Sequence, residues 1–185
     1  MKGRAYVASD DSVALRSALT RYSGGVCLEI GAGNGGNLIE LAKSFELVAG
    51  TDLVKPTTHD WKEHGANYVI ADAASCFREG VFDLVAFNPP YVPSEGITDR
   101  AVDGGREGTE VAMRFLRSAL EVVRKEGRIV MLTSSSNPAD ILEATCAEKG
   151  FTATKISERR LFFETLYVYE ISTVPKYGSG EFLQS

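Results

Sequence analysis

The sequence has few of the residues from which metal, disulfide or membrane-spanning structures are built. Its 185 residues include three cysteines and two histidines, and no two cysteines form a CxxC pair. No apolar run approaches membrane-spanning length, and the first residues lack the apolar segment of a signal peptide. We therefore expect a soluble, cytoplasmic protein with reduced thiols in its core and no metal site.

An excess of positive charge is also missing. The chain has 20 Lys and Arg against 25 Asp and Glu, a net charge of −5, which is unfavourable for covering nucleic-acid phosphates. An acidic enzyme can still carry a local basic groove. The net negative charge therefore makes binding to nucleic acid less expected without excluding it. Five basic residues gather near one predicted helix: Arg114, Arg117, Arg124, Lys125 and Arg128. Acidic residues interrupt them, which favours a solvated face.

Short strand-like runs alternate with helical patterns along the chain. Five runs predict strands, at 26–31, 47–52, 67–72, 82–87 and 128–134. Several are apolar throughout, as expected for a parallel sheet covered by helices on both faces. Helices are predicted at about 11–22, 37–45, around 61, about 107–124 and 138–149. The runs 151–157 and 161–171 predict an antiparallel hairpin, because only a tight link separates them.

This order predicts an α/β fold with an open, doubly wound, mostly parallel sheet of seven strands that ends in an antiparallel hairpin. There is no internal repeat and no linker between domains. We expect one domain at 1–174, in which 1–25 form a helical segment over the ligand-binding end of the sheet. Residues 175–185 are expected to be a flexible tail.

A glycine-rich stretch, "LEIGAGNGGN", leads from the first predicted strand into the next helix. Gly31, Gly33 and Gly36 satisfy the GxGxxG pattern. Gly31, Gly33 and Gly35 would let the backbone approach a ligand at a helix N-terminus. Asp52 ends the second strand about 20 residues later, as in dinucleotide-binding proteins. This motif alone does not separate NAD from S-adenosylmethionine, because Asp52 would bind ribose hydroxyls in both ligands.

Two further carboxylates favour S-adenosylmethionine. Glu29 lies two residues before Gly31, where its charge would repel a pyrophosphate but suit a sulfonium ligand with a free ammonium group. Asp72 ends the third strand and could accept a hydrogen bond from an adenine amino group. The alternatives are that Glu29 is a solvated strand residue and Asp72 a turn residue. We expect S-adenosylmethionine as cofactor and S-adenosylhomocysteine as product.

The fourth strand ends in Asn88, Pro89, Pro90 and Tyr91, and strand four of such a sheet ends beside the ligand. An amide or aromatic amine nitrogen is a poor nucleophile, because its lone pair is delocalised. The Asn88 side-chain oxygen and the Pro89 carbonyl could accept its two hydrogens, while Tyr91 offers a face for stacking. We expect these four residues to bind substrate, with Asn88, Pro89 and Tyr91 catalytic. A mere strand stop would explain the prolines alone.

With these motifs assembled, the chain resembles the HemK/PrmC family of glutamine N5-methyltransferases, which are Rossmann-like class I methyltransferases. Within it, the chain is similar to the short archaeal and eukaryotic branch that methylates class I release factors. The resemblance is carried by "YVASDDSVALRSAL", "LEIGAGNG", "TD", "NPPYVP", "AVDGGREGTEVAMRFL" and "ERRLFFETLYVYE". Adenine-N6 and guanine-N2 methyltransferases use similar tetrapeptides, so the later segments make the resemblance specific.

The resemblance implies methyl transfer to the glutamine of a Gly-Gly-Gln sequence in a release factor. It implies cofactor contacts from six residues: Ser12, Glu29, Gly31, Asp52, Asp72 and Ala73. Asn88 would contact both cofactor and substrate, with Pro89 and Tyr91 framing the glutamine. Ser12 would close over the cofactor, although the usual Pro-x-Glu-Asp-Ser/Thr stretch is Ala-Ser-Asp-Asp-Ser at 8–12 here.

The resemblance to the short members of the family also implies a partner, because those members use a small zinc-containing activator protein. That protein pairs with the sheet edge at strand three. Here that strand reads "ANYVIA", which is uncharged and indicates an edge open to pairing. An edge shielded by its own loops is the alternative. The segment "DGGREG" at 103–108 is either a flap over the substrate or the start of the long helix. Bacterial members of the family carry an extra N-terminal helical domain that holds the release factor. We expect no such domain here, because only about 25 residues precede the first predicted strand.

Three other functions are compatible with parts of this pattern. A DNA or RNA adenine-N6 methyltransferase would share every catalytic residue, but no target-recognition domain is recognisable. A non-catalytic scaffold that binds S-adenosylmethionine would not need paired amine acceptors. An NAD-dependent oxidoreductase would need only the glycine motif and Asp52.

Overall fold

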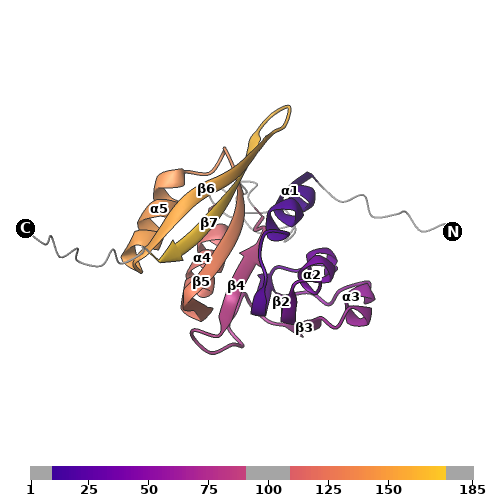
Figure 1. Cartoon of the computed structure of the whole chain (residues 1–185). Coiled ribbons are helices and arrows are strands. Elements are labelled where there is room, and N and C mark those ends of the chain that lie inside the picture. The colour runs from indigo at the N-terminus through magenta and orange to yellow at the C-terminus, as the bar shows by residue number, and fades with distance from the viewer. Residues whose placement is uncertain (1–9, 91–108, 174–185) are drawn as a thin grey trace, which may run out of the picture.

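The computed structural model of the protein describes residues 10–90 and 109–173 (Figure 1). In this part of the chain the helices are α1 (Asp10–Leu19), α2 (Gly36–Leu41), α3 (Asp60–Glu63), α4 (Glu110–Val122) and α5 (Ala139–Glu148). The strands are β1 (Gly24–Ile30), β2 (Phe45–Asp52), β3 (Asn67–Ile70), β4 (Phe82–Phe87), β5 (Val123–Ser134), β6 (Phe151–Arg160) and β7 (Thr165–Thr173). Predictions for Tyr91, for the flap at 103–108 and for the tail at 175–185 lie outside the described residues.

The strands form one sheet in the order β3-β2-β1-β4-β5-β7-β6. Strands β1 to β5 are parallel to one another, while β7 is antiparallel to both β5 and β6. The chain progresses outward from β1 to β3 and then returns to β4 on the other side of β1. The predicted doubly wound sheet with its antiparallel hairpin is therefore confirmed, and its topological switch point lies between β1 and β4.

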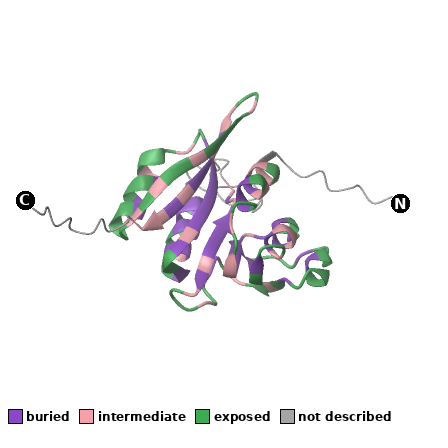
Figure 2. Ribbon diagram, in the orientation of Figure 1, coloured by how far each residue is buried: buried purple, intermediate pink, exposed green. Residues whose placement is uncertain are grey.

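Helices cover both faces of the sheet, as the apolar strands predict. In β4, Val85 and Phe87 point into a core shared with α4 and α5, while Leu84 and Ala86 point into a second core shared with α1 and α2. Successive strand residues face opposite sides, so where both faces of a strand are covered the consecutive positions are apolar, as they are from Leu84 to Phe87. Figure 2 shows these buried central strands between more exposed helices.

The long helix ends earlier than the sequence pattern predicts. α4 ends at Val122 and β5 begins at Val123, whereas the prediction placed the helix to about 124 and the strand from 128. Arg124, Lys125 and Arg128 therefore lie on a strand rather than on the long helix, and Arg124 and Lys125 are exposed there, as a solvated face requires. Pairing with β4 and β7 decides this boundary, and that pairing is not a local property of the sequence.

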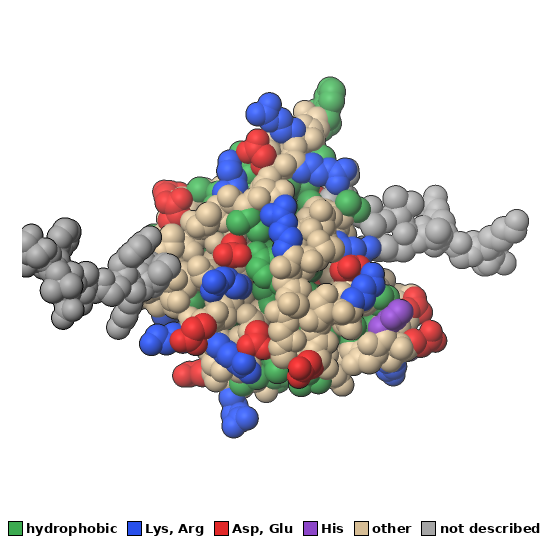
Figure 3. All heavy atoms as spheres, in the orientation of Figure 1, with side chains coloured by type: hydrophobic (Ala, Val, Ile, Leu, Met, Phe, Trp, Pro, Cys, Tyr) green, Lys and Arg blue, Asp and Glu red, His purple; other side chains and the backbone are tan. Residues whose placement is uncertain are grey.

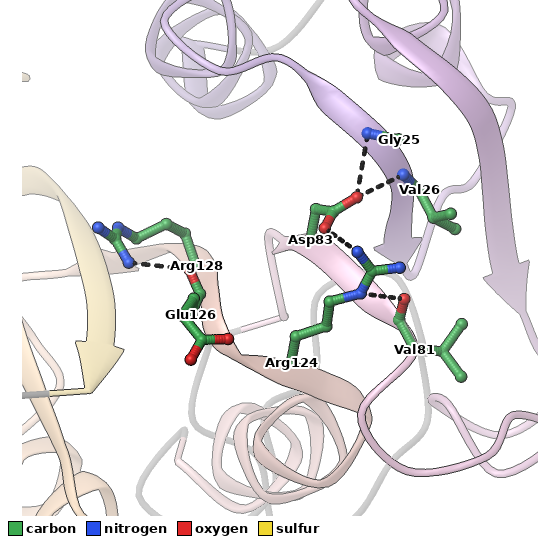
Figure 4. Close-up of polar contacts among 7 residues, drawn as sticks. All are labelled: Gly25, Val26, Val81, Asp83, Arg124, Glu126 and Arg128. Atoms are coloured by element: carbon green, nitrogen blue, oxygen red, sulfur yellow. Dashed lines mark hydrogen bonds and ion pairs between the residues drawn. The ribbon is translucent and has the colours of Figure 1, made fainter.

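Arg124 belongs to a polar network at the amino ends of the central strands (Figure 4). Its Nη1 lies 2.5 Å from Asp83 Oδ1, and its Nε donates to the Val81 carbonyl at 3.0 Å. The other Asp83 oxygen accepts from the backbone N–H groups of Gly25 and Val26 at 3.0 and 2.7 Å. One carboxylate thus joins β1, β4 and β5 at the amino ends of these strands, opposite the carboxyl ends at which a ligand is expected.

The hairpin turn also differs from its prediction. β6 continues through Arg160, so the turn consists of residues 161–164, which the sequence pattern placed partly in a strand. The Leu161 N–H donates to the Glu164 carbonyl at 2.8 Å and closes the turn. Phe162 and Phe163 are consequently 92% and 93% exposed at the tip. Aromatic residues favour strands in general, but the cross-strand register overrides that preference here.

The distribution of charged side chains and the burial of the cysteines can also be compared with the predictions. Basic and acidic side chains are interspersed on the face shown in Figure 3. Cys27 and Cys146 are buried as expected, but Cys76 is exposed, so the prediction that all three thiols lie in the core is wrong. Two successive turns after β3 direct Ala74 inward and Cys76 outward. Within residues 10–90 and 109–173, no helix is long and apolar enough to cross a membrane.

Candidate active site

A cleft of about 1120 Å³ opens at the carboxyl ends of the parallel strands. The register explains its position, because Ile30 pairs with Thr51 on one side and with Phe87 on the other. The next residues along these three strands are Gly31, Asp52 and Asn88. Eight of the predicted site residues line the cleft: Ser12, Glu29, Gly31, Gly33, Asp52, Ala73, Asn88 and Pro90. Ligands of doubly wound folds bind at this switch point.

The glycine loop presents its backbone to the cleft. Gly31 has φ 71°, and a Cβ there would lie 3.0 Å from the Phe115 ring, so a side chain has neither the conformation nor the space. Gly33 has φ 53°, and no atom of a described residue lies within 4 Å of the position of its absent Cβ. The loop is therefore curved tightly and open, as a backbone in close contact with a ligand requires.

Asp52 is held at the end of β2 by two backbone donors. Its Oδ2 accepts from the Gly33 N–H and its Oδ1 from the Val54 N–H, both at 3.0 Å. A carboxylate can accept about four hydrogen bonds, so acceptor sites remain for a ligand. The predicted role of Asp52, accepting from two ribose hydroxyls, fits this geometry.

Glu29 is buried rather than solvated, so the alternative interpretation of it is wrong. Its side chain is 4% exposed, and Oε1 accepts from Asn37 Nδ2 at 2.7 Å. Burial raises the pKa of Glu29 to about 8, while the Asn37 hydrogen bond and the nearby Arg16 oppose the shift. Oε2 is buried with no hydrogen-bond partner among the described residues. A buried acceptor of this kind fits an ammonium group and disfavours a pyrophosphate.

Arg16 and Asn37 are site residues that sequence reasoning missed. Arg16 lies on α1 and lines the cleft, and its Nε donates to Asn37 Oδ1 at 3.2 Å. The available signal was its spacing, because Ser12 and Arg16 are four residues apart and share a helix face. Which face of that helix meets the glycine loop, however, is decided by tertiary packing.

Of the two predicted site residues after β3, Ala73 lines the cleft and Asp72 does not. Ala73 lines the cleft with φ 48°, an unusual backbone conformation for a residue with a side chain. Asp72 does not line it, and its half-exposed carboxylate lies 3.1 Å from Arg114 Nη1. Arg114 is itself exposed and borders the cleft, a position that the prediction of a solvated face did not specify. The adenine contact proposed for Asp72 stays a prediction.

Asn88 is placed where the sequence motif predicts an acceptor. It follows β4 directly and lines the cleft, and its Oδ1 is buried without a hydrogen-bond partner in the described part of the chain. Leaving such a group unpaired costs about 1–3 kcal/mol, so it is well suited to bind a donor on a ligand. Pro90 also lines the cleft, whereas Pro89 is buried and does not.

Comparisons with known proteins identify relatives along most of the chain. No family model matches. The protein N5-glutamine methyltransferase MJ0928 of Methanocaldococcus jannaschii is 30% identical over 145 residues, which cover 70% of this chain and 72% of that protein. The mouse methyltransferase HEMK2 is 30% identical over 179 residues, which cover 86% and 83%.

A solved structure is similar in both fold and sequence. It is a chain of the E. cuniculi Mtq2–Trm112 complex, which is described as responsible for methylating the translation termination factor eRF1. The match has a TM-score of 0.75 and 28% identity, and it covers 91% of this chain and 98% of that one. The similarity therefore extends over the sheet, its hairpin and the cleft together.

Proposed function

This chain belongs to the HemK family of class I methyltransferases, and from that premise we propose that it methylates the side-chain amide nitrogen of a glutamine in a peptide release factor. The Gly-Gly-Gln sequence of a class I release factor is the proposed acceptor. The name of the relative MJ0928, which refers to glutamine N5 methylation, and the description of the Mtq2–Trm112 structure, which refers to eRF1 methylation, support this substrate class. Such a substrate also favours the cytoplasm as the site of the reaction.

The observation that carries this proposal is the Oδ1 of Asn88 at the end of β4, which is buried and has no hydrogen-bond partner among the residues that the structure describes. An amide –NH₂ group offers two donors, and Asn88 Oδ1 would accept one of them. The Pro89 carbonyl is the proposed second acceptor. Holding both hydrogens fixes the direction of the nitrogen and opposes delocalisation of its lone pair, which is preorganisation rather than proton transfer.

The cleft residues also fit S-adenosylmethionine as the cofactor. Asp52 would bind the ribose hydroxyls, Glu29 Oε2 the ammonium group, and the turn at Ala73 would border the adenine. When bound, S-adenosylmethionine supplies an electrophilic methyl group on a positively charged sulfur and leaves as neutral S-adenosylhomocysteine. The glutamine nitrogen gains the methyl group and releases one proton, which water can accept.

We further propose that a small zinc-containing activator protein pairs with β3. This strand lies at the edge of the sheet, and its Val69 and Ile70 are 36% and 60% exposed. Leu47 and Val54 add exposed apolar surface. An uncharged, apolar strand edge is normally protected by a partner. The structural relative is a complex of two proteins, Mtq2 and Trm112, which supports a partner of this kind.

A methyl-transfer assay with labelled S-adenosylmethionine tests the function. The acceptors are a release factor with Gly-Gly-Gln, the same factor with Gly-Gly-Ala, and total DNA and RNA, each with and without the activator. We expect label on the first acceptor alone, mapped to the glutamine by mass spectrometry. Label on nucleic acid alone would instead identify an adenine-N6 methyltransferase, with the same motif acting on a different amine.

Co-purification tests the partner surface. Replacing Ile70 with Lys should reduce recovery of the activator, because a charge would be buried in the interface. Phe162→Lys is the matched control, since it places the same charge on exposed apolar surface at the opposite side of the sheet. Equal recovery with both variants would contradict the assignment of the β3 edge.

A further inference from the structure

We propose that Arg16 binds the carboxylate of the amino-acid end of S-adenosylmethionine and S-adenosylhomocysteine, so that α1 takes part in recognising the cofactor. This inference rests on the proposed function for the identity of the cofactor. It assigns a specificity-determining role to a residue of the N-terminal helix.

Arg16 extends from α1 across the glycine loop to the start of α2. A Cβ at Gly36 would lie 2.9 Å from Arg16 Nη2, so the guanidinium lies against the first residue of α2 in the space that the missing side chain leaves. Both residues line the cleft. The guanidinium is thereby directed to the end of the cleft that also contains Glu29.

Asn37 stands between the guanidinium of Arg16 and the carboxyl group of Glu29. It accepts from Arg16 Nε at 3.2 Å and donates to Glu29 Oε1 at 2.7 Å. In the described ranges, Arg16 forms no ion pair with a carboxylate. The amide therefore links the guanidinium to the Glu29 carboxyl group while keeping the two apart, which differs from a simple structural salt bridge.

Because Asn37 separates them, both Arg16 and Glu29 keep atoms that can bind a ligand. A guanidinium has five N–H donors, and the bond to Asn37 uses the one on Nε. Glu29 Oε2 is buried and has no partner among the described residues. A free amino acid group carries an ammonium and a carboxylate on one carbon, so it presents two opposite charges at short separation. Glu29 Oε2 suits the ammonium, and the Arg16 Nη atoms suit the carboxylate, by a charge-assisted and planar pairing.

The competing explanation is that Arg16 only anchors α1 to α2 and offsets the charge of Glu29. The two explanations differ in what they predict for ligands. A carboxylate-binding residue distinguishes ligands with and without that carboxylate, whereas a structural anchor affects all ligands of the cleft alike.

Isothermal calorimetry with three ligands separates them and needs no methyl acceptor. The probes are S-adenosylhomocysteine, its decarboxylated analogue S-adenosyl-3-thiopropylamine, and 5′-methylthioadenosine, which lacks the whole amino-acid end. The wild-type protein should prefer S-adenosylhomocysteine to the decarboxylated analogue by roughly 10–100-fold, as expected for a charge-assisted hydrogen-bond pair.

Arg16→Leu should erase that preference while its affinity for 5′-methylthioadenosine stays within about twofold. Arg16→Lys should keep part of the preference for S-adenosylhomocysteine over the decarboxylated analogue. Lysine has the positive charge but lacks the planar, two-pronged hydrogen-bonding geometry of a guanidinium. Arg21→Leu, a charge removal at an exposed residue just after α1, is the control. Thermal unfolding of each variant shows whether the fold is kept.

Two results would overturn the proposal. One is equal binding of S-adenosylhomocysteine and its decarboxylated analogue by the wild-type protein, a result that does not depend on any variant. The other is a proportional loss for all three ligands in Arg16→Leu, which would assign Arg16 to anchoring. Failure of release-factor methylation with intact discrimination between these ligands would refute the proposed substrate and leave this inference standing.

Discussion

Glu29 provides the most direct test of the site, through the effect of pH on stability. We expect Glu29→Gln to become more stable than the wild type as the pH rises. The side chain is 4% exposed, and its pKa rises from 4.5 to about 8 because burial disfavours the charged form. Gln keeps an oxygen that can accept from Asn37, so the substitution removes the charge and retains the hydrogen bond seen at 2.7 Å.

The sign follows from which state holds the proton. Below about pH 4.5 both folded and unfolded chains are protonated at residue 29, so no penalty arises. Between about 4.5 and 8 the unfolded chain loses this proton while the folded chain keeps it, and the stability of the wild type falls. Above about 8 both are ionised and the penalty is constant. At about 1.4 kcal/mol per pKa unit, the penalty is about 1 kcal/mol at pH 5 and about 3 kcal/mol at pH 7.

The difference between the variant and the wild type should therefore grow by about 2 kcal/mol from pH 5 to pH 7, or roughly 4–8 °C in Tm for a protein of this size. Calorimetric or denaturant unfolding at a series of pH values measures it. Only the change with pH matters, so a constant effect of the substitution cancels. Glu121→Gln, at an exposed position, controls for loss of one negative charge. Parallel pH curves for Glu29→Gln and the wild type would refute the assignment of Glu29 as a buried carboxyl group with a raised pKa.

Three further substitutions test other parts of the cleft. Asn88→Ala should lower kcat by roughly 100-fold or more while the Kd for S-adenosylhomocysteine stays nearly unchanged, and near-full turnover would disprove the role of its Oδ1. Asp52→Ala should weaken S-adenosylhomocysteine binding by roughly 10–100-fold in a titration, and unchanged affinity would exclude the ribose contact. Gly31→Ala should lower the free energy of unfolding by about 1–2 kcal/mol, because its φ is 71° and its Cβ would contact Phe115; a denaturant melt that superimposes on the wild type would contradict this.

Local sequence patterns were sufficient for the fold class and for much of the cleft. Fully apolar strands require two covered faces, and glycine or proline at a strand end marks where the chain turns. Because parallel strands end at a common edge, the positions of Gly31, Asp52 and Asn88 in the sequence are enough to group them at one site. Each of these inferences depends on neighbours in the chain or on one general property of parallel sheets.

Only the tertiary structure decided which distant residues meet. Arg16 reaches Asn37 across 21 positions, and Arg114 reaches Asp72 across 42, so both were missed or assigned to solvent. The burial of Glu29, and with it the rise of its pKa, arises from packing of α1 and α2 over β1 and not from any residue beside it in sequence. Likewise, strand register left Phe162 and Phe163 in a turn against their preference for strands. Periodicity determines which faces of an element are apolar, but the free energy of long-range packing determines which polar groups share a cleft and in which state of ionisation.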